Sequence, residues 1–113
     1  GGHIDPNETP DMAATREAKE ETGLDVELIE FSPLGQSQEE LAPSAFPFHT
    51  SLHNVGDHDH YGLYYACRSK DIKFVKNHES QDIAWLSAKE IKKLKNIPDS
   101  VRKMALHILK KYA

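Results

Sequence analysis

The sequence predicts a mixed α/β (α+β) fold that forms a single domain over residues 1–113. Helix-type patterns open and close the chain, and strand-type patterns fill its middle. A length of 113 residues fits one domain rather than two. A hydrophobic fraction of 38% with 28% charged residues is typical of a globular chain that buries one modest core.

The first helix is expected over about residues 11–22. Thr9 is a suitable N-cap, and Pro10 follows at the first helical position, where its missing N–H is not needed. Gly23 can adopt the left-handed conformation that often ends a helix. These three signals bound the helix at both ends.

Strand-type segments follow the first helix, and a turn is expected at residues 54–57. The segment at residues 61–68 is mostly apolar, which favours a central strand. The strands are predicted over residues 26–31, 46–55, 61–68 and 83–86, the last as a short buried strand.

The C-terminal part is expected to form two helices. Ser87 and Glu90 have the spacing of a capping box, so a helix should begin there and run to about residue 94. A second helix should begin near residues 98–100 and carry one apolar stripe at three- and four-residue spacing. Packing explains this stripe, and we assign it no chemistry.

Composition excludes several classes of protein. The 14 Lys and Arg against 18 Asp and Glu give a net charge of −4, which argues against binding a nucleic-acid polymer. No apolar run approaches the ~20 residues that span a bilayer, so we expect no membrane partner. Cys67 is the only cysteine and no signal peptide opens the chain, so we expect a cytoplasmic protein.

Three glutamates of the first helix form the main candidate site. Glu17, Glu20 and Glu21 fall within an arc of about 100° on one face of the helix. A solvated acidic face is one interpretation of this pattern. The other is a bound divalent cation, because hard oxygen ligands favour Mg²⁺, Mn²⁺ or Ca²⁺ over Zn²⁺.

A longer pattern surrounds these glutamates. Residues 2–24 match G-x5-E-x7-R-E-U-x-E-E-x-G-U, where U is aliphatic, and a chance match at one start point is about 10⁻⁸ at average residue frequencies. The chain therefore resembles the Nudix hydrolase family, tightly in this Nudix box and loosely around Trp85. The resemblance implies an α/β/α sandwich on a mixed sheet, here without the segment that usually precedes the box. The fixed letters fall on Gly2, Glu8, Arg16, Glu17, Glu20, Glu21 and Gly23.

The resemblance also implies an activity and a cofactor. It implies a pyrophosphohydrolase that cleaves the diphosphate linkage in a nucleoside diphosphate linked to another group X, with Mg²⁺ or Mn²⁺ as the cofactor. The implied metal ligands are Glu17, Glu20, Glu21 and the carbonyl oxygen of Gly1, with that of Gly2 as the alternative. A catalytically silent Nudix-like nucleotide-binding or regulatory module is the alternative, which the intact set of glutamates disfavours.

Further roles follow from the same resemblance. Arg16 should hold a carboxylate of the box in position, and Glu8 could meet Arg16 or hold a metal-bound water. Because Arg16 and Glu17 are neighbours in sequence, we do not expect them simply to face one another on the helix. The remaining catalytic role, the general base, stays open among Glu17, Glu20 and Glu79, with Asp82 as the alternative to Glu79.

Other features carry weaker predictions. His58 and His60 could place two imidazoles on one strand face, and we favour contact with solvent or substrate over a metal site. Residues 36–60 are expected to line the substrate pocket, but the substrate-binding residues stay unknown. Without the usual preceding segment the sheet would have an open edge, which predicts a homodimer that covers it.

Overall fold

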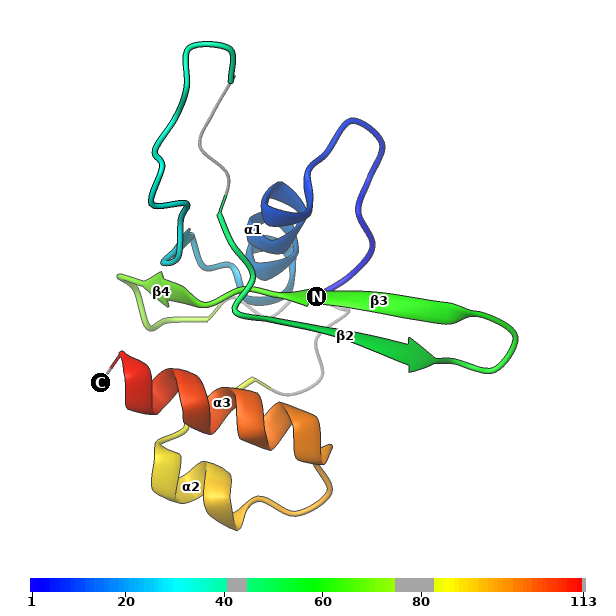
Figure 1. Cartoon of the computed structure of the whole chain (residues 1–113). Coiled ribbons are helices and arrows are strands. Elements are labelled where there is room, and N and C mark those ends of the chain that lie inside the picture. The colour runs from blue at the N-terminus through cyan, green and yellow to red at the C-terminus, as the bar shows by residue number, and fades with distance from the viewer. Residues whose placement is uncertain (41–44, 75–82, 113) are drawn as a thin grey trace. The chain divides into compact units, whose positions relative to one another are not determined.

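The computed structural model describes residues 1–40, 45–74 and 83–112, in two units at Gly1–Ile83 and Ala84–Ala113 that are taken separately below. The first unit holds one helix and four strands, and the second holds two helices (Figure 1). In chain order the elements are α1 (Pro10–Thr22), β1 (Val26–Leu28), β2 (His49–Asn54), β3 (Asp59–Tyr64), β4 (Cys67–Ser69), α2 (Ala88–Lys93) and α3 (Asp99–Lys111).

Helix α1 begins and ends where the sequence predicts. Thr9 is extended at the N-cap, and its hydroxyl accepts a hydrogen bond from the backbone N–H of Met12. At the other end Gly23 has φ 76° and donates its backbone N–H to the carbonyl of Lys19 at 2.8 Å. Glycine adopts this left-handed conformation without a steric penalty, so the helix stops there.

The strands pair in two antiparallel, two-stranded sheets. β1 pairs with β4, and β2 pairs with β3 in a hairpin whose turn contains Gly56 at φ 107°. The predicted strand at residues 61–68 is divided at residues 65–66, because its first half pairs with β2 and its second half with β1. In the described residues the strands thus form two small antiparallel sheets, not the single mixed sheet that we expected.

Small side chains make up most of the described core of the first unit. Ala13 of α1, Ala45 and Ala66 are at most 6% exposed, and Leu24 is 5% exposed. One carboxylate oxygen of Asp11 accepts the backbone N–H of Ala45 at 3.1 Å, which ties the first turn of α1 to the sheet region. Partial burial alone would raise the pKa of Asp11, but its hydrogen bonds outweigh burial and lower it.

The second unit confirms both predicted helices and corrects the strand before them. Ser87 and Glu90 form a complete capping box at α2, and the backbone N–H of Ser87 lowers the pKa of Glu90. Arg102 of α3 donates to the carbonyls of Ile91 and Leu94 at the end of α2. Residues 83–86 are not assigned as a strand, and Trp85 is 54% exposed, because this segment leads directly into the cap of α2.

None of the described helices has the length and apolarity that a membrane crossing requires.

Candidate active site

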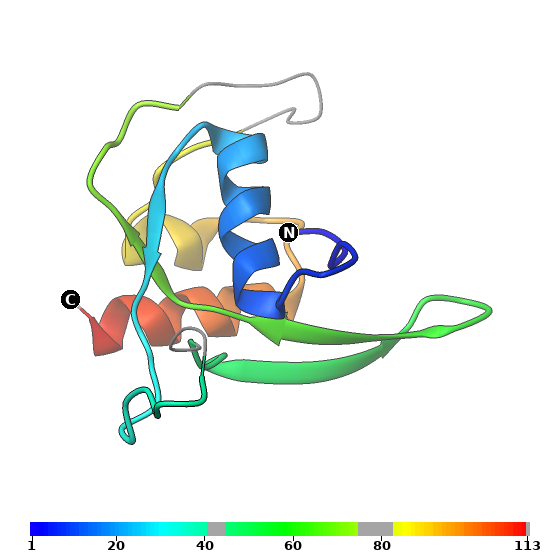
Figure 2. The same cartoon turned by 90° about the horizontal axis from the view of Figure 1, so that it is seen from above.

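The nine residues before α1 form a loop that runs beside this helix (Figure 2). The glutamates of α1 differ in exposure there: the side chain of Glu17 is 15% exposed, that of Glu20 49% and that of Glu21 35%. Glu17 is therefore the most confined of the three carboxylates, and Glu20 is the most accessible.

Arg16 joins the loop to the helix through its guanidinium group. Its Nε and Nη2 atoms donate to the two oxygens of Glu8 at 2.8 and 3.1 Å, which is a bidentate pair. Its Nη1 donates to Glu17 at 3.1 Å and to Glu20 at 3.2 Å. Nη2 also donates to the carbonyl of His3 at 2.9 Å.

These contacts correct one expectation and confirm another. We did not expect Arg16 and Glu17 to face one another, yet they form an ion pair at 3.1 Å. The long arginine side chain presents five donors in a fixed fork, so it can reach a sequence neighbour and a residue one turn away together. The expected meeting of Arg16 and Glu8 is present.

Gly2 lies directly against Glu17. A Cβ atom built on Gly2 would lie 2.2 Å from Oε1 of Glu17, which is far inside van der Waals contact. A Cβ atom built on Gly1 would meet nothing within 4 Å. The absence of a side chain at Gly2 therefore lets the loop backbone approach the most confined carboxylate of α1.

Glu21 has a different partner. Its two carboxylate oxygens lie 3.1 and 3.2 Å from the backbone nitrogen of Gly1. The structure thus brings Glu8, Arg16, Glu17 and Glu20 together, and it places Glu21 with Gly1.

Glu79 and Asp82 lie outside the described residues. Across residues 1–40, 45–74 and 83–112, no group of three or more His, Cys, Asp or Glu side chains is already arranged to hold a metal ion.

Comparisons with known proteins identify this arrangement. A family model described as the NUDIX domain matches residues 1–107. The chain belongs to the NUDIX family. It is also similar to the crystal structure of a NUDIX family hydrolase from Clostridium perfringens, with 32% sequence identity and a TM-score of 0.85. That match covers 99% of this chain and 79% of the other. The comparison with curated proteins gives no match.

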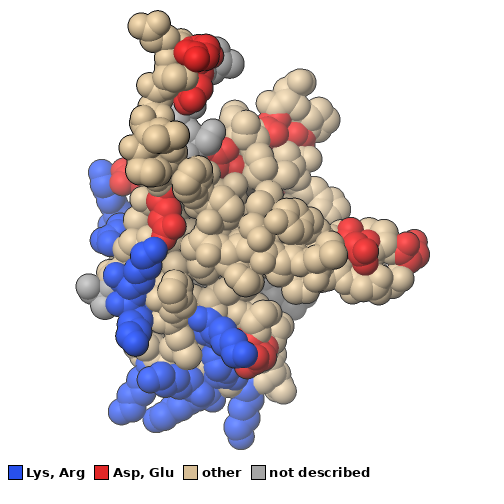
Figure 3. All heavy atoms as spheres, in the orientation of Figure 1, with Lys and Arg blue, Asp and Glu red and all other residues tan. Residues whose placement is uncertain are grey.

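These matches confirm the predicted α/β Nudix-like fold and the prediction of a Nudix hydrolase. Members of this family generally use divalent metal ions and act on small molecules. The charge of the NUDIX hydrolase agrees with that chemistry: residues 1–83 contain 16 of the 18 acidic residues but only 6 of the 14 basic ones. Lys and Arg gather instead over α2 and α3 (Figure 3).

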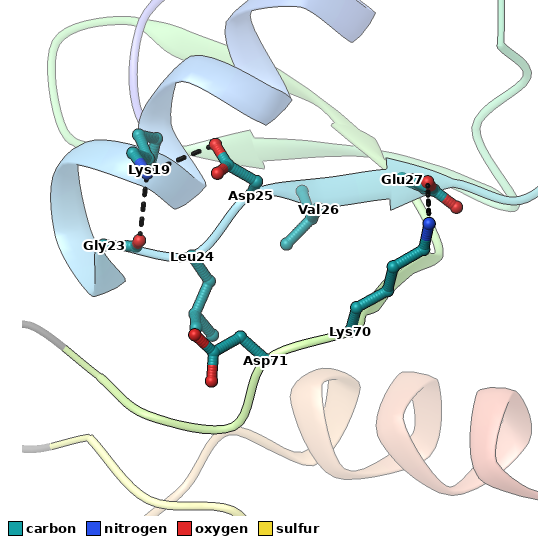
Figure 4. A pocket seen from close by; sticks show the side chains of 8 residues that line it. All are labelled: Lys19, Gly23, Leu24, Asp25, Val26, Glu27, Lys70 and Asp71. Carbon is teal, nitrogen blue, oxygen red and sulfur yellow. Dashed lines mark hydrogen bonds and ion pairs between the residues drawn. The ribbon is translucent and has the colours of Figure 1, made fainter.

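A pocket of about 470 Å³ lies between the C-terminal end of α1 and β1 (Figure 4). Four of its five charged residues pair with one another, Lys19 with Asp25 at 3.2 Å and Lys70 with Glu27 at 3.5 Å. It contains none of the glutamates of the box and none of residues 36–60. We assign this pocket no role in the chemistry of the NUDIX hydrolase.

Sequence reasoning missed two contacts of the loop. The carbonyl of His3 accepts from Arg16, and Asp5 lies 3.4 Å from the same guanidinium. Both residues fall at unspecified positions of the box pattern, so the spacing gave no signal for them.

Gly2→Ala is expected to displace Glu17 and to lower hydrolytic activity. The added Cβ would occupy the position of the Glu17 carboxylate, so either the loop or the side chain must move. Steady-state kinetics should show this loss. Gly1→Ala is the matched control, since its Cβ has open space and its carbonyl is kept. Equal activity of the two variants would contradict a packed contact at Gly2.

The pKa of Glu8 is expected to depend on Arg16. The hydrogen bond from Arg16 lowers the pKa of Glu8 below 4.5, and the same pair raises the pKa of Arg16. A lowered pKa stabilises the fold above the unfolded-state pKa, and this stabilisation is lost as the pH falls through the folded-state pKa. Carboxyl ¹³C NMR should show Glu8 titrating nearer to 4.5 in Arg16→Ala than in the wild type. The same Glu8 pKa in both proteins would disprove the coupling.

Proposed function

We propose that this NUDIX hydrolase cleaves the diphosphate linkage of a nucleoside diphosphate joined to another group X, with Mg²⁺ or Mn²⁺ held at the box. The observation that carries the proposal is the contact set of Arg16, which holds Glu8, Glu17 and Glu20 at 2.8–3.2 Å. Arg16 thus holds two carboxylates of one helix face close together, and carboxylate oxygens are the ligands that a divalent ion such as Mg²⁺ prefers.

The residues of the box fit such an ion. Their donors are carboxylate and carbonyl oxygens, which Mg²⁺ and Mn²⁺ prefer. Gly2 keeps the space beside Oε1 of Glu17 free of any side chain. We assign Glu17, Glu20, Glu21 and the carbonyl of Gly1 as the metal ligands.

Each residue then has a distinct task in the reaction. When bound, the metal supplies positive charge for the phosphates and lowers the pKa of a water molecule. Arg16 is a positioning residue, because its bond to Glu8 fixes the guanidinium and leaves Nη1 to orient Glu17 and Glu20. The general base is one of Glu17, Glu20 and Glu79, and Asp82 remains the alternative to Glu79.

The proposal also covers the substrate pocket, the oligomeric state and the location of the enzyme. The group X remains open, and residues 36–60 are the segment that we propose to line the substrate pocket. A homodimer and a cytoplasmic location belong to the same proposal. Light scattering tests the dimer directly, and a monomeric mass would contradict it.

Hydrolysis of a substrate panel tests the function. Nucleotide sugars, dinucleotide polyphosphates, ADP-ribose and oxidised nucleoside triphosphates are incubated with Mg²⁺, with Mn²⁺ or with excess EDTA. We expect turnover of at least one class, with products that show cleavage of the diphosphate, and no turnover in EDTA. Binding of a nucleotide without turnover in either metal would instead support the silent binding module.

A further inference from the structure

The β2–β3 hairpin carries a group of histidines to which the proposed hydrolysis assigns no chemical step. His58 precedes β3 and His60 lies within it, two residues further along and so on the same face. Their Nε2 atoms lie 3.0 Å apart. His53 is directly opposite His60, but its Nε2 contacts the hydroxyl of Ser51 at 2.7 Å. Two imidazole nitrogens thus converge, while the third is engaged elsewhere.

Asp57 fixes the protonation pattern of this pair. Its Oδ1 lies 2.6 Å from Nδ1 of His58. A carboxylate can only accept, so Nδ1 of His58 carries a proton and its Nε2 is an acceptor when the ring is neutral. Nε2 of His60 must then be the donor in the bond between the two rings. One proton therefore lies between two nitrogens that are both able to ligate a metal.

The spacing of the pair is that of two ligands on one ion. Zinc–imidazole bonds are about 2.0–2.1 Å long, so two nitrogens on one ion are about 2.9–3.4 Å apart for bond angles from 90° to tetrahedral. A carboxylate behind one ligand is also typical of metal-bound histidine, since it holds the ring and its tautomer. Imidazole selects Zn²⁺, Ni²⁺ or Cu²⁺ rather than Mg²⁺.

We propose that His58 and His60 form a binding site for a Zn²⁺-class divalent transition metal, separate from the carboxylates of the box. No three such side chains of the described residues surround one point, so the site has two protein ligands and water completes the shell. His58 is 59% exposed, which leaves the ion open to exchange. On binding, the proton on Nε2 of His60 leaves and Nδ1 of the same ring becomes protonated, so the neutral ring changes tautomer.

The site borders the loop that precedes α1. The ring of His3 packs edge-to-face on that of His60, with centroids 5.7 Å apart. The carbonyl of the same His3 accepts from Arg16. A metal at His58 and His60 would thus be linked through His3 to the loop that precedes α1. None of its protein ligands would come from the box.

Titration with Zn²⁺ in excess Mg²⁺ and without substrate tests the proposal. Long-range ¹H–¹⁵N NMR should show both Nε2 signals shifting and His60 changing tautomer, while the signals of His49 and His107 stay in place. Calorimetry should show at least tenfold weaker binding for His58→Ala and His60→Ala, and about tenfold weaker binding for Asp57→Asn. His49→Ala, on the same hairpin, should bind as the wild type does.

Two outcomes would overturn the site. One is Zn²⁺ affinity that is unchanged in both His58→Ala and His60→Ala. The other is Zn²⁺ affinity that Glu20→Gln removes, since the ion would then lie at the box. Circular dichroism of each variant checks that the fold is retained. Because the assay contains no substrate, its result does not depend on whether the chain hydrolyses diphosphates.

Discussion

Glu20→Gln is expected to lower kcat by at least about 100-fold in the presence of Mg²⁺. The amide keeps the size of the side chain but loses the charge that binds a divalent ion. Even the loss of a residue that only orients a metal ligand lowers metal affinity or activity by about 10- to 100-fold, so the loss of a ligand should cost at least as much. The side chain of Glu20 is 49% exposed, so the loss should come from the chemistry and not from unfolding. Initial rates at saturating substrate measure it.

Glu27→Gln is the matched control for this variant. Glu27 lies on β1, is 70% exposed and pairs with Lys70, so the same chemical change occurs outside the box. It should leave kcat and the unfolding temperature unchanged. Full activity in Glu20→Gln would show that Glu20 is not a ligand of the catalytic metal.

Arg16→Ala is expected to have the second large effect, on both activity and stability. It removes the shared partner of Glu8, Glu17 and Glu20, and the first two carboxylates are only 13% and 15% exposed. Carboxylates that lose a charged partner while poorly solvated repel one another. We expect a lower unfolding temperature and an apparent Mg²⁺ affinity about 10- to 100-fold weaker in kinetic titrations.

Two further variants distinguish a positioning role of Arg16 at the metal site from a general loss of stability. Arg68→Ala removes a guanidinium from β4 of the same unit and should leave the Mg²⁺ dependence unchanged. Arg16→Lys keeps the charge but loses the fork, so it should recover stability better than Mg²⁺ affinity. If Arg16→Ala lowers stability with no change in Mg²⁺ dependence, the role of Arg16 is structural only.

The helices could be predicted because their signals are local. Thr9, Pro10 and Gly23 bound α1 within the residues that they cap, and Ser87 with Glu90 does the same for α2. The strands could not be delimited in this way, since pairing partners lie far apart in the chain. The division of residues 59–69 into β3 and β4 follows from two different partners, which no local pattern of those residues records.

The residues of the candidate site could be predicted from the sequence, but the contacts between their side chains could not. The spacing of the box placed Glu17, Glu20 and Glu21 on one face, and the resemblance supplied their roles. The reach of Arg16 to its own neighbour depends on side-chain torsions that a sequence does not specify. The contact of Gly2 with Glu17 depends on the path of the loop, which Arg16 fixes through His3.

Direct binding of Mn²⁺ at the box tests the central claim most directly. Electron paramagnetic resonance counts free Mn²⁺ during a titration and needs no knowledge of the substrate. The account predicts one Mn²⁺ site in the wild type, at least about tenfold weaker in Glu17→Gln and in Glu20→Gln and unchanged in Glu27→Gln. Equal Mn²⁺ affinity in all four proteins would contradict a metal centre built on these carboxylates.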